Sequence, residues 1–170
     1  MSARDFTVIK HGGAVRVHDT DDRTTSSEDA AMLPGEPIKS NTPASAGEFA
    51  IKLATGDPEV ATDMMLGIAA KQSTETSSAE GEVEYISLIP NQTVLRAKAH
   101  TATNVNTAAK LLALKGHWVT CDLTSSAFTV NEDEATDPNV HGFQILGGDI
   151  VKGTLDFVVS SLATQAGTTI

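Results

Sequence analysis

Residues 141–160 constrain the fold more than any other part of this sequence. Apolar residues or glycine alternate with polar ones along the second half of the segment, at Val151, Gly153, Leu155, Phe157 and Val159. Phe143 and Ile145 repeat this alternation, which has the period of two expected for a strand with one buried face. Gly147 and Gly148 separate the two runs and suit a tight turn with positive φ angles. The segment therefore predicts a long antiparallel hairpin that turns at these two glycines.

Further short runs rich in apolar residues follow one another along the chain. They cover residues 49–53, 64–70, 82–89, 93–99, 117–123 and 127–130. Turn-forming residues separate several of these runs. Together with the hairpin they predict a mainly β fold, a small antiparallel β-barrel or sandwich with one short α-helix.

The single helix is expected over residues 105–115. Asn104 is a suitable N-cap, and Gly116 suits the position that follows the helix. The spacing of apolar residues predicts a buried face made of Val105, Ala108, Ala109 and Leu112.

The N-terminal residues 1–46 have a different composition from the rest and predict an extended arm. Two short apolar runs, 6–9 and 14–17, flank two glycines and form either a small hairpin or an arm that pairs elsewhere. Residues 20–47 are dominated by Asp, Thr, Ser, Glu, Ala and Pro, which bury too little apolar surface to fold alone. The packed β-rich domain is expected over residues 47–170.

Composition excludes several classes of function. The chain has 170 residues, a net charge of -10 and a pI near 4.8, so direct binding of nucleic acid is not expected. Cys121 is the only cysteine and falls on the apolar side of its run, which predicts an inert core residue. The sequence has no run long enough to cross a membrane and no signal-peptide core, so we expect a soluble protein made in the cytoplasm.

No motif for catalysis, a cofactor or a metal is found. The acidic loop 131–139 lacks the central glycine and final glutamate of a calcium-binding loop, so a solvated acidic turn is the simpler interpretation. The five histidines are scattered, and no nucleophile or phosphate-binding motif is present. We therefore expect no catalytic residues, no cofactor and no metal site.

Trp118 is the most informative single side chain. It falls on the face of its strand opposite Val119 and Cys121. The residue either lies in the core beneath the helix or is presented to a partner, since aromatic residues are enriched in interfaces.

The order and texture of these segments resemble those of small virion proteins of tailed bacteriophages. The resemblance rests on the polar arm, the run GDPEVATDMMLGIAAKQSTETSSAEGEVEYISLIPNQTVLRAKA, the short Ala/Leu helix closed by Lys-Gly, and HGFQILGGDIVKGTLDFVV. It covers residues 47–160, and the family it resembles most is that of the capsid decoration, or cement, proteins.

This resemblance implies a non-catalytic protein on the outside of the virion capsid. Such a protein binds the major capsid protein, forms a homotrimer or another homo-oligomer, and stabilises contacts between capsid subunits. The arm would contribute to the capsid contact by strand addition, through Phe6, Val8, Ile9, Val15 and Val17. Deleting residues 1–47 would then leave a folded domain that no longer binds particles.

Two alternatives remain open at the level of the sequence. One is a different virion role, in the tail or the head–tail joint, which would use the same kind of fold with another partner. The other is a small β-barrel enzyme or ligand-binding protein, which would require a concave pocket with convergent polar groups.

Overall fold

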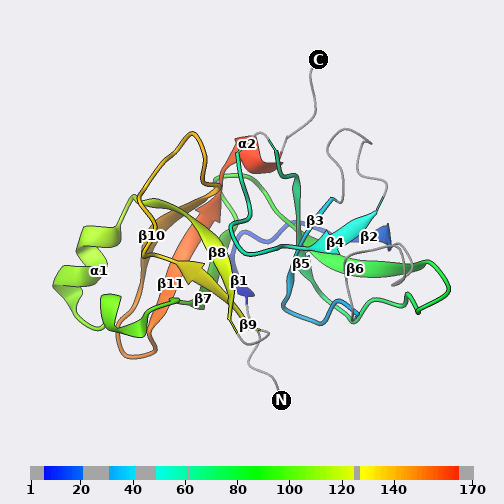
Figure 1. Cartoon of the computed structure of the whole chain (residues 1–170), viewed down its shortest axis with the longest axis horizontal. Coiled ribbons are helices and arrows are strands. Elements are labelled where there is room, and N and C mark those ends of the chain that lie inside the picture. The colour runs from blue at the N-terminus through cyan, green and yellow to red at the C-terminus, as the bar shows by residue number, and fades with distance from the viewer. Residues whose placement is uncertain (1–5, 21–30, 41–48, 61, 125–126, 165–170) are drawn as a thin grey trace.

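The chain folds into two antiparallel β-sheets, which a computed structural model describes over residues 6–20, 31–40, 49–60, 62–124 and 127–164. The first sheet has the order β1 (Phe6–Lys10), β7 (Val94–Lys98), β11 (Thr154–Val159), β10 (Phe143–Asp149), β8 (Trp118–Thr124) and β9 (Ala127–Asn131). The second has the order β2 (Val15–Thr20), β6 (Gly81–Ser87), β5 (Met65–Ala69), β3 (Pro37–Ser40) and β4 (Ala50–Lys52). The sheets follow one another along the long axis of the molecule (Figure 1), and the prediction of a mainly β fold with one main helix is confirmed.

One of the sheets forms a half-barrel. In the first sheet, Ala99 follows β7 and makes a parallel bridge with Val130 of β9. The amide of His100 donates a hydrogen bond to the carbonyl of Val130 at 2.8 Å. The last strand of this sheet therefore returns towards β7, and the curvature encloses the main hydrophobic core.

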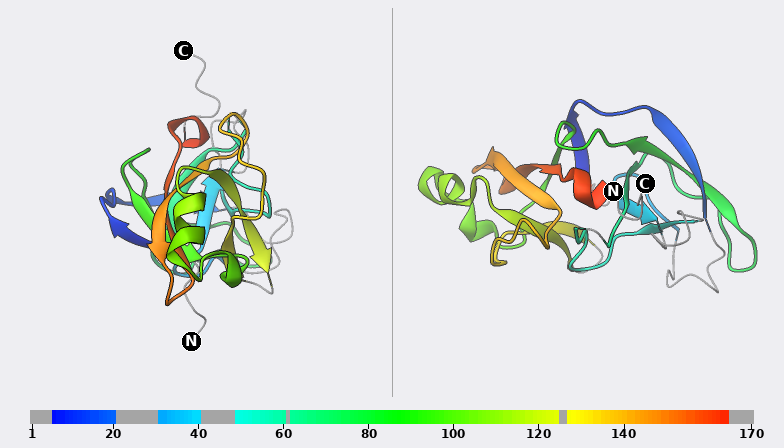
Figure 2. Two further views of the ribbon diagram at one scale, coloured as in Figure 1. Left: turned by 90° about the vertical axis from the view of Figure 1, so that its left-hand side faces the viewer. Right: turned by 90° about the horizontal axis from the view of Figure 1, so that it is seen from above.

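A bent ribbon of four strands connects the two sheets. β1 pairs with β7 in the first sheet, whereas β2 pairs with β6 in the second. Figure 2 shows this N-terminal segment running beside β6 and β7 from one half of the molecule to the other. Between the sheets the amide of Gly13 donates to the carbonyl of Ser87 at 2.8 Å. A Cβ at Gly13 would lie 2.5 Å from that oxygen, so the close approach requires glycine.

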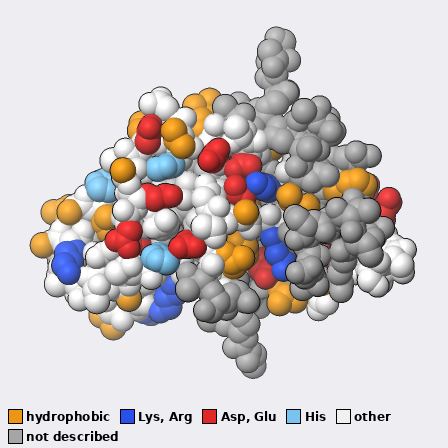
Figure 3. Space-filling model, in the orientation of Figure 1, with side chains coloured by type: hydrophobic (Ala, Val, Ile, Leu, Met, Phe, Trp, Pro, Cys, Tyr) orange, Lys and Arg blue, Asp and Glu red, His pale blue; other side chains and the backbone are white. Residues whose placement is uncertain are grey.

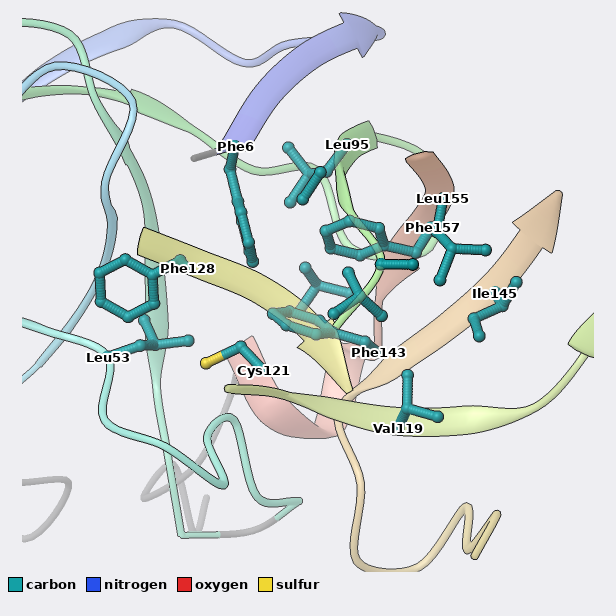
Figure 4. Packing of buried hydrophobic residues seen from close by; sticks show 14 of the residues in the cluster. Phe6, Leu53, Leu95, Val119, Cys121, Phe128, Phe143, Ile145, Leu155 and Phe157 are labelled. Carbon is teal, nitrogen blue, oxygen red and sulfur yellow. The ribbon is translucent and has the colours of Figure 1, made fainter. Parts of the chain in front are cut away.

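Phenylalanine rings form the centre of the main core (Figure 4). Four of the five phenylalanines of the chain lie in this cluster. The ring of Phe6 lies 5.2 Å from Phe157 and 5.7 Å from Phe143, in the tilted and edge-on geometries that aromatic pairs prefer. Cys121 is fully buried beside them, which confirms the predicted core position, and this burial raises the pKa of its thiol.

The prediction that residues 1–46 form an arm outside the packed domain is wrong for much of this segment. Residues 6–20 supply β1 and β2, and residues 31–40 supply β3. All three strands are hydrogen-bonded within the sheets. Residues 1–5, 21–30 and 41–46, which were also expected in the arm, lie outside the described residues.

A second, smaller core explains why the segment that ends in β3 packs. Met32 and Ile38 are almost fully buried against Val83 and Tyr85 of β6. The segment is polar overall, so its composition did not indicate that a few apolar residues would pack it against the sheet.

The hairpin of β10 and β11 is confirmed, but its turn lies later than predicted. Gly147 and Gly148 belong to β10, and residues 150–153 form the turn. The carboxylate of Asp149 accepts hydrogen bonds from the amides of Val151 and Lys152, at 2.9 and 3.1 Å, which stabilises this turn. Gly153 has a φ of 61° and supplies the left-handed residue.

The helix α1 (Ala108–Leu114) begins later than predicted, after a 3₁₀ turn at Ala102–Asn104. Thr107, not Asn104, is its N-cap, and Gly116 follows it with a φ of 89°, as expected. The expected buried face is also wrong, because Leu112 is 71% exposed while Leu111 and Leu114 pack against the core. A short helix, α2 (Ser161–Thr164), follows β11.

Candidate partner-binding surfaces

Two of the residues predicted to contact a partner face the core. Phe6 is 1% exposed and lies at the centre of the aromatic cluster. Val8 is half-buried and packs against the same cluster. Their cross-strand partners are the buried Ala97 and Leu95, so β1 directs both side chains inward. The structure therefore corrects the assignment of Phe6 and Val8 as contact residues.

Ile9, Val15 and Val17 remain on the surface, at 41%, 63% and 55% exposure. Val15 and Val17 lie on the same face of β2, which has a strand neighbour on one side only within the described residues. Ile9 lies in β1 at a β-bulge, apart from that pair. We name Val15, Val17 and the open side of β2 the β2 edge.

The other end of the molecule carries an apolar surface that the sequence analysis missed. Leu112, Leu146, Ile150 and Val151 are 71%, 38%, 40% and 91% exposed. A hollow of about 540 Å³ lies between α1 and β10, and Leu112, Leu146 and Ile150 line it. We name these four residues the helix-end patch. Figure 3 shows hydrophobic side chains at this end of the molecule as well as elsewhere on this face, and acidic side chains nearer its middle.

A third surface lies on the outer face of the first sheet. Gln144 of β10 is paired with Trp118 of β8 on one side and with Val158 of β11 on the other. Lys10 of β1 is paired with Val94 of β7. All five residues line one open hollow of about 580 Å³, which we name the outer-face hollow.

Loop residues and α2 border the outer-face hollow. His11, Asn91 and Gln92 line it beside the strands, and Leu162 of α2, which is 55% exposed, also lines it. Trp118 is half-buried there and lies outside both core clusters. The alternative of a tryptophan in the core is therefore wrong, and Trp118 is a surface side chain in a concave site.

The acidic loop is more structured than a solvated turn. Glu132 is 4% exposed, and its carboxylate accepts hydrogen bonds from the amides of His100 and Thr101, at 2.9 and 2.8 Å. Glu134 accepts from the amide and the hydroxyl of Thr120, at 2.9 and 2.8 Å. These acids therefore satisfy backbone donors, and the described residues contain no group of three or more His, Cys, Asp or Glu that could hold a metal ion.

A partly buried charge cluster lies between β3 and the loop that follows β4. The ammonium of Lys39 lies 2.7 Å from Asp57 and 2.8 Å from Asp63. These carboxylates also accept hydrogen bonds from the amides of Ala54 and Glu59, at 2.5 and 2.7 Å. The cluster fastens the loop to the sheet, and every charged group in it has a partner.

Burial and pairing have opposing effects on the pKa values of this cluster. Burial acts to lower the pKa of Lys39, but hydrogen bonds to both carboxylates outweigh it and raise the pKa above the ordinary 10.5. Burial raises the pKa of Asp57. For Asp63, burial is outweighed by hydrogen bonds from the amide of Glu59 and from Lys39, so its pKa is lowered. The arrangement favours a charged lysine, whose single positive charge offsets one of the two carboxylate charges.

Searches against protein-family models, curated proteins and solved structures found no match for this chain. Among the described residues, no helix combines the length and the apolar character needed to span a membrane.

Proposed function

We propose that this chain is a structural virion protein that binds the outer surface of a tailed-bacteriophage capsid and stabilises contacts between its major capsid subunits. The observation that carries the proposal is the position of two exposed apolar surfaces, the β2 edge and the helix-end patch. They lie towards opposite ends of the long axis (Figure 1). A protein that joins two neighbouring subunits must contact both of them, and a two-ended molecule meets this requirement.

The β2 edge supports binding by strand addition. Within the described residues β2 has a hydrogen-bonded neighbour on one side only, although β4 also lies near it, and a strand from a capsid subunit would supply hydrogen-bond partners on the other side. Val15 and Val17 would lose their exposure in the same step, and full burial of a valine is worth about 1.5–3 kcal/mol.

The helix-end patch supports a second contact of a different kind. Leu112 and Val151 are strongly exposed, and the neighbouring hollow of about 540 Å³ is concave enough to receive an apolar side chain. Such a contact is modest by itself. In a capsid each copy would contact at least two subunits, so the combined affinity would exceed that of either contact.

The proposal also covers the assembly and the location of the protein. We propose a homotrimer or another homo-oligomer on the capsid exterior, acting by binding and not by catalysis. The mass of the free protein in solution tests the oligomeric state. A tail or head–tail joint protein would use the same surfaces, and the position of the protein on the virion distinguishes the two roles.

The first test is to locate the protein on virions of the phage that encodes it. Antibodies against the purified chain would label these virions, and cryo-EM of the same particles would show the site. We expect density on the outside of the head, at repeated positions between major capsid subunits. Labelling of the tail, or of no particle, would contradict the proposal.

The second test measures how surface variants bind to purified heads that lack this chain. Val17→Glu in the β2 edge and Val151→Glu in the helix-end patch should each reduce binding at least about tenfold, which corresponds to 1.4 kcal/mol. Val140→Glu is the matched control, because Val140 is 42% exposed and belongs to neither surface. Wild-type binding by both test variants would refute the two-ended arrangement.

A further inference from the structure

We infer that the outer-face hollow is a binding site for an acidic oligosaccharide. This inference goes beyond the proposed capsid role and does not depend on it. It rests on the row of side chains across the sheet, on the free polar groups around that row, and on the local balance of charge.

The row across the sheet gives the hollow an aromatic and apolar floor. Trp118, Gln144 and Val158 follow one another on adjacent strands, and Val94 and Lys10 continue the lining on β7 and β1. Tryptophan offers a flat apolar surface that matches the C–H face of a sugar ring. Because these residues lie on a hydrogen-bonded sheet, their positions are set before a ligand binds.

Free amide groups surround this floor. The side chains of Asn91, Gln92 and Gln144 make no hydrogen bond to any other described residue, although all three line the hollow. A carboxamide offers both donors and an acceptor, which suits the neighbouring hydroxyl groups of a sugar. A volume of about 580 Å³ lies within the usual range for ligand sites.

The charge of the hollow differs from that of the whole chain. The chain has a net charge of -10, yet none of the described residues lining the hollow is Asp or Glu. Lys10 and His11 line it, and Lys10 forms no ion pair within the described residues. A ligand with a carboxylate would gain a favourable ion pair here and would meet no acidic side chain among the described lining residues.

Backbone conformation is also unusual at this site. His11 and Asn91, with φ angles of 55° and 57°, are the two non-glycine residues with positive φ in the described chain, and both line the hollow. Sparsely populated conformations of this kind cluster at ligand sites, where the surrounding structure maintains them.

The direct test is a titration of the full chain with two acidic sugars, tetragalacturonate and sialyllactose. Their neutral counterparts, methyl-esterified tetragalacturonide and lactose, serve as matched probes. Trp118 is the only tryptophan of the chain, so its fluorescence reports directly on this hollow. We expect saturable binding of at least one acidic probe with a change in fluorescence, and weaker binding of its neutral counterpart.

Variants identify the site independently of fluorescence, by calorimetry. Trp118→Ala and Gln144→Ala should each weaken binding at least about tenfold. Lys10→Gln should weaken binding of the acidic probe and leave that of the neutral probe unchanged. Lys110→Gln on α1 is the matched control and should bind as the wild type does. Thermal unfolding of each variant checks that it is folded. If Trp118→Ala does not fold, Gln144→Ala still tests the site.

Three outcomes would overturn the inference. The first is that neither acidic probe binds at millimolar concentration. The second is that a probe binds equally well to Gln144→Ala and to the wild type, which would place it elsewhere. The third is that neutral probes bind as tightly as acidic ones, which would remove the role of Lys10. Binding to capsids is a separate measurement, so failure here leaves the proposed function intact.

Discussion

Gly147 and Gly148 are neighbours in β10, but only one of them has surroundings that require glycine. A Cβ at Gly148 would lie 2.1 Å from the carbonyl oxygen of Thr154, on the paired strand. A Cβ at Gly147 would have no atom within 4 Å. Neither residue has a positive φ, so the reason for glycine at position 148 is space and not conformation.

This difference gives a matched pair of variants. Gly148→Ala should destabilise the protein by about 1–3 kcal/mol, because a strand backbone has to move to admit the methyl group. Gly147→Ala should change stability by less than about 1 kcal/mol. Urea unfolding of both variants measures the two values. Equal destabilisation by both would support a turn at these glycines, as the sequence predicted, and would contradict the observed register.

Four of the residues predicted to bind a partner divide into an exposed pair and an inward-facing pair. Val15 and Val17 are exposed, as a contact requires, whereas Phe6 and Val8 face inward. Alternation along β1 predicts that Phe6 and Val8 share one face, but it does not say whether that face meets solvent or core. The answer depends on β7, which lies far along the sequence.

At the scale of the element, the Lys39 cluster connects a strand to a loop. Lys39→Met would leave Asp57 and Asp63 partly buried without their cation, and breaking such a pair typically costs about 3–5 kcal/mol. Lys71→Met is the matched control, since its pair with Glu84 is exposed and should contribute less than about 1 kcal/mol. Chemical denaturation at neutral pH compares the two. A similar small loss for both would contradict the structural role of the cluster.

The raised pKa of Lys39 predicts a dependence on alkaline pH. A lysine with a higher pKa in the folded state stabilises the fold fully below its unfolded pKa. This contribution is lost as the pH rises through the folded value, which lies above 10.5. The stability difference between the wild type and Lys39→Met should therefore shrink at strongly alkaline pH. A stability difference that stays constant at strongly alkaline pH would show that the charge of Lys39 does not cause it.

The buried face of the helix α1 differs from the one that the spacing of its apolar residues predicts. Val105 fits a helical stripe, but it is fully buried in the segment before the helix. Once the helix begins at Ala108, Leu111 and Leu114 face the core, and Leu112 turns to solvent. This rotation creates part of the helix-end patch, which is why the sequence did not reveal it.

At the scale of the whole molecule, the N-terminal strands make the fold depend on both ends of the chain. Deleting residues 1–47 would remove β1, β2 and β3, together with the buried side chains of Phe6, Met32 and Ile38. Loss of even one such side chain typically costs about 2–5 kcal/mol, comparable to much of the stability of a small domain.

We therefore expect the truncated chain to be unfolded, contrary to the expectation from the sequence. Circular dichroism and a thermal melt test this directly. Removal of residues 1–5, which lie outside the described residues, is the control and should preserve the cooperative transition. A cooperative melt in the chain that lacks residues 1–47 would show that the two sheets hold together without their N-terminal strands.

The sequence determined the class of fold and the inward face of several strands. Leu155, Phe157 and Val159 are buried as their alternation predicts, because a period of two depends only on the local geometry of a strand. The core position of Cys121 was also readable from the residues alone.

Only the tertiary structure decided which strands pair, where the long hairpin turns, and which apolar residues remain exposed. Each of these depends on contacts between residues far apart in the chain, such as Phe6 with the rings of Phe143 and Phe157. The outer-face hollow is the clearest case. Its lining comes from β1, β7, β8, β10 and β11, from the loop residues beside them, and from α2. No local pattern contains this site, because it exists only once those strands are adjacent.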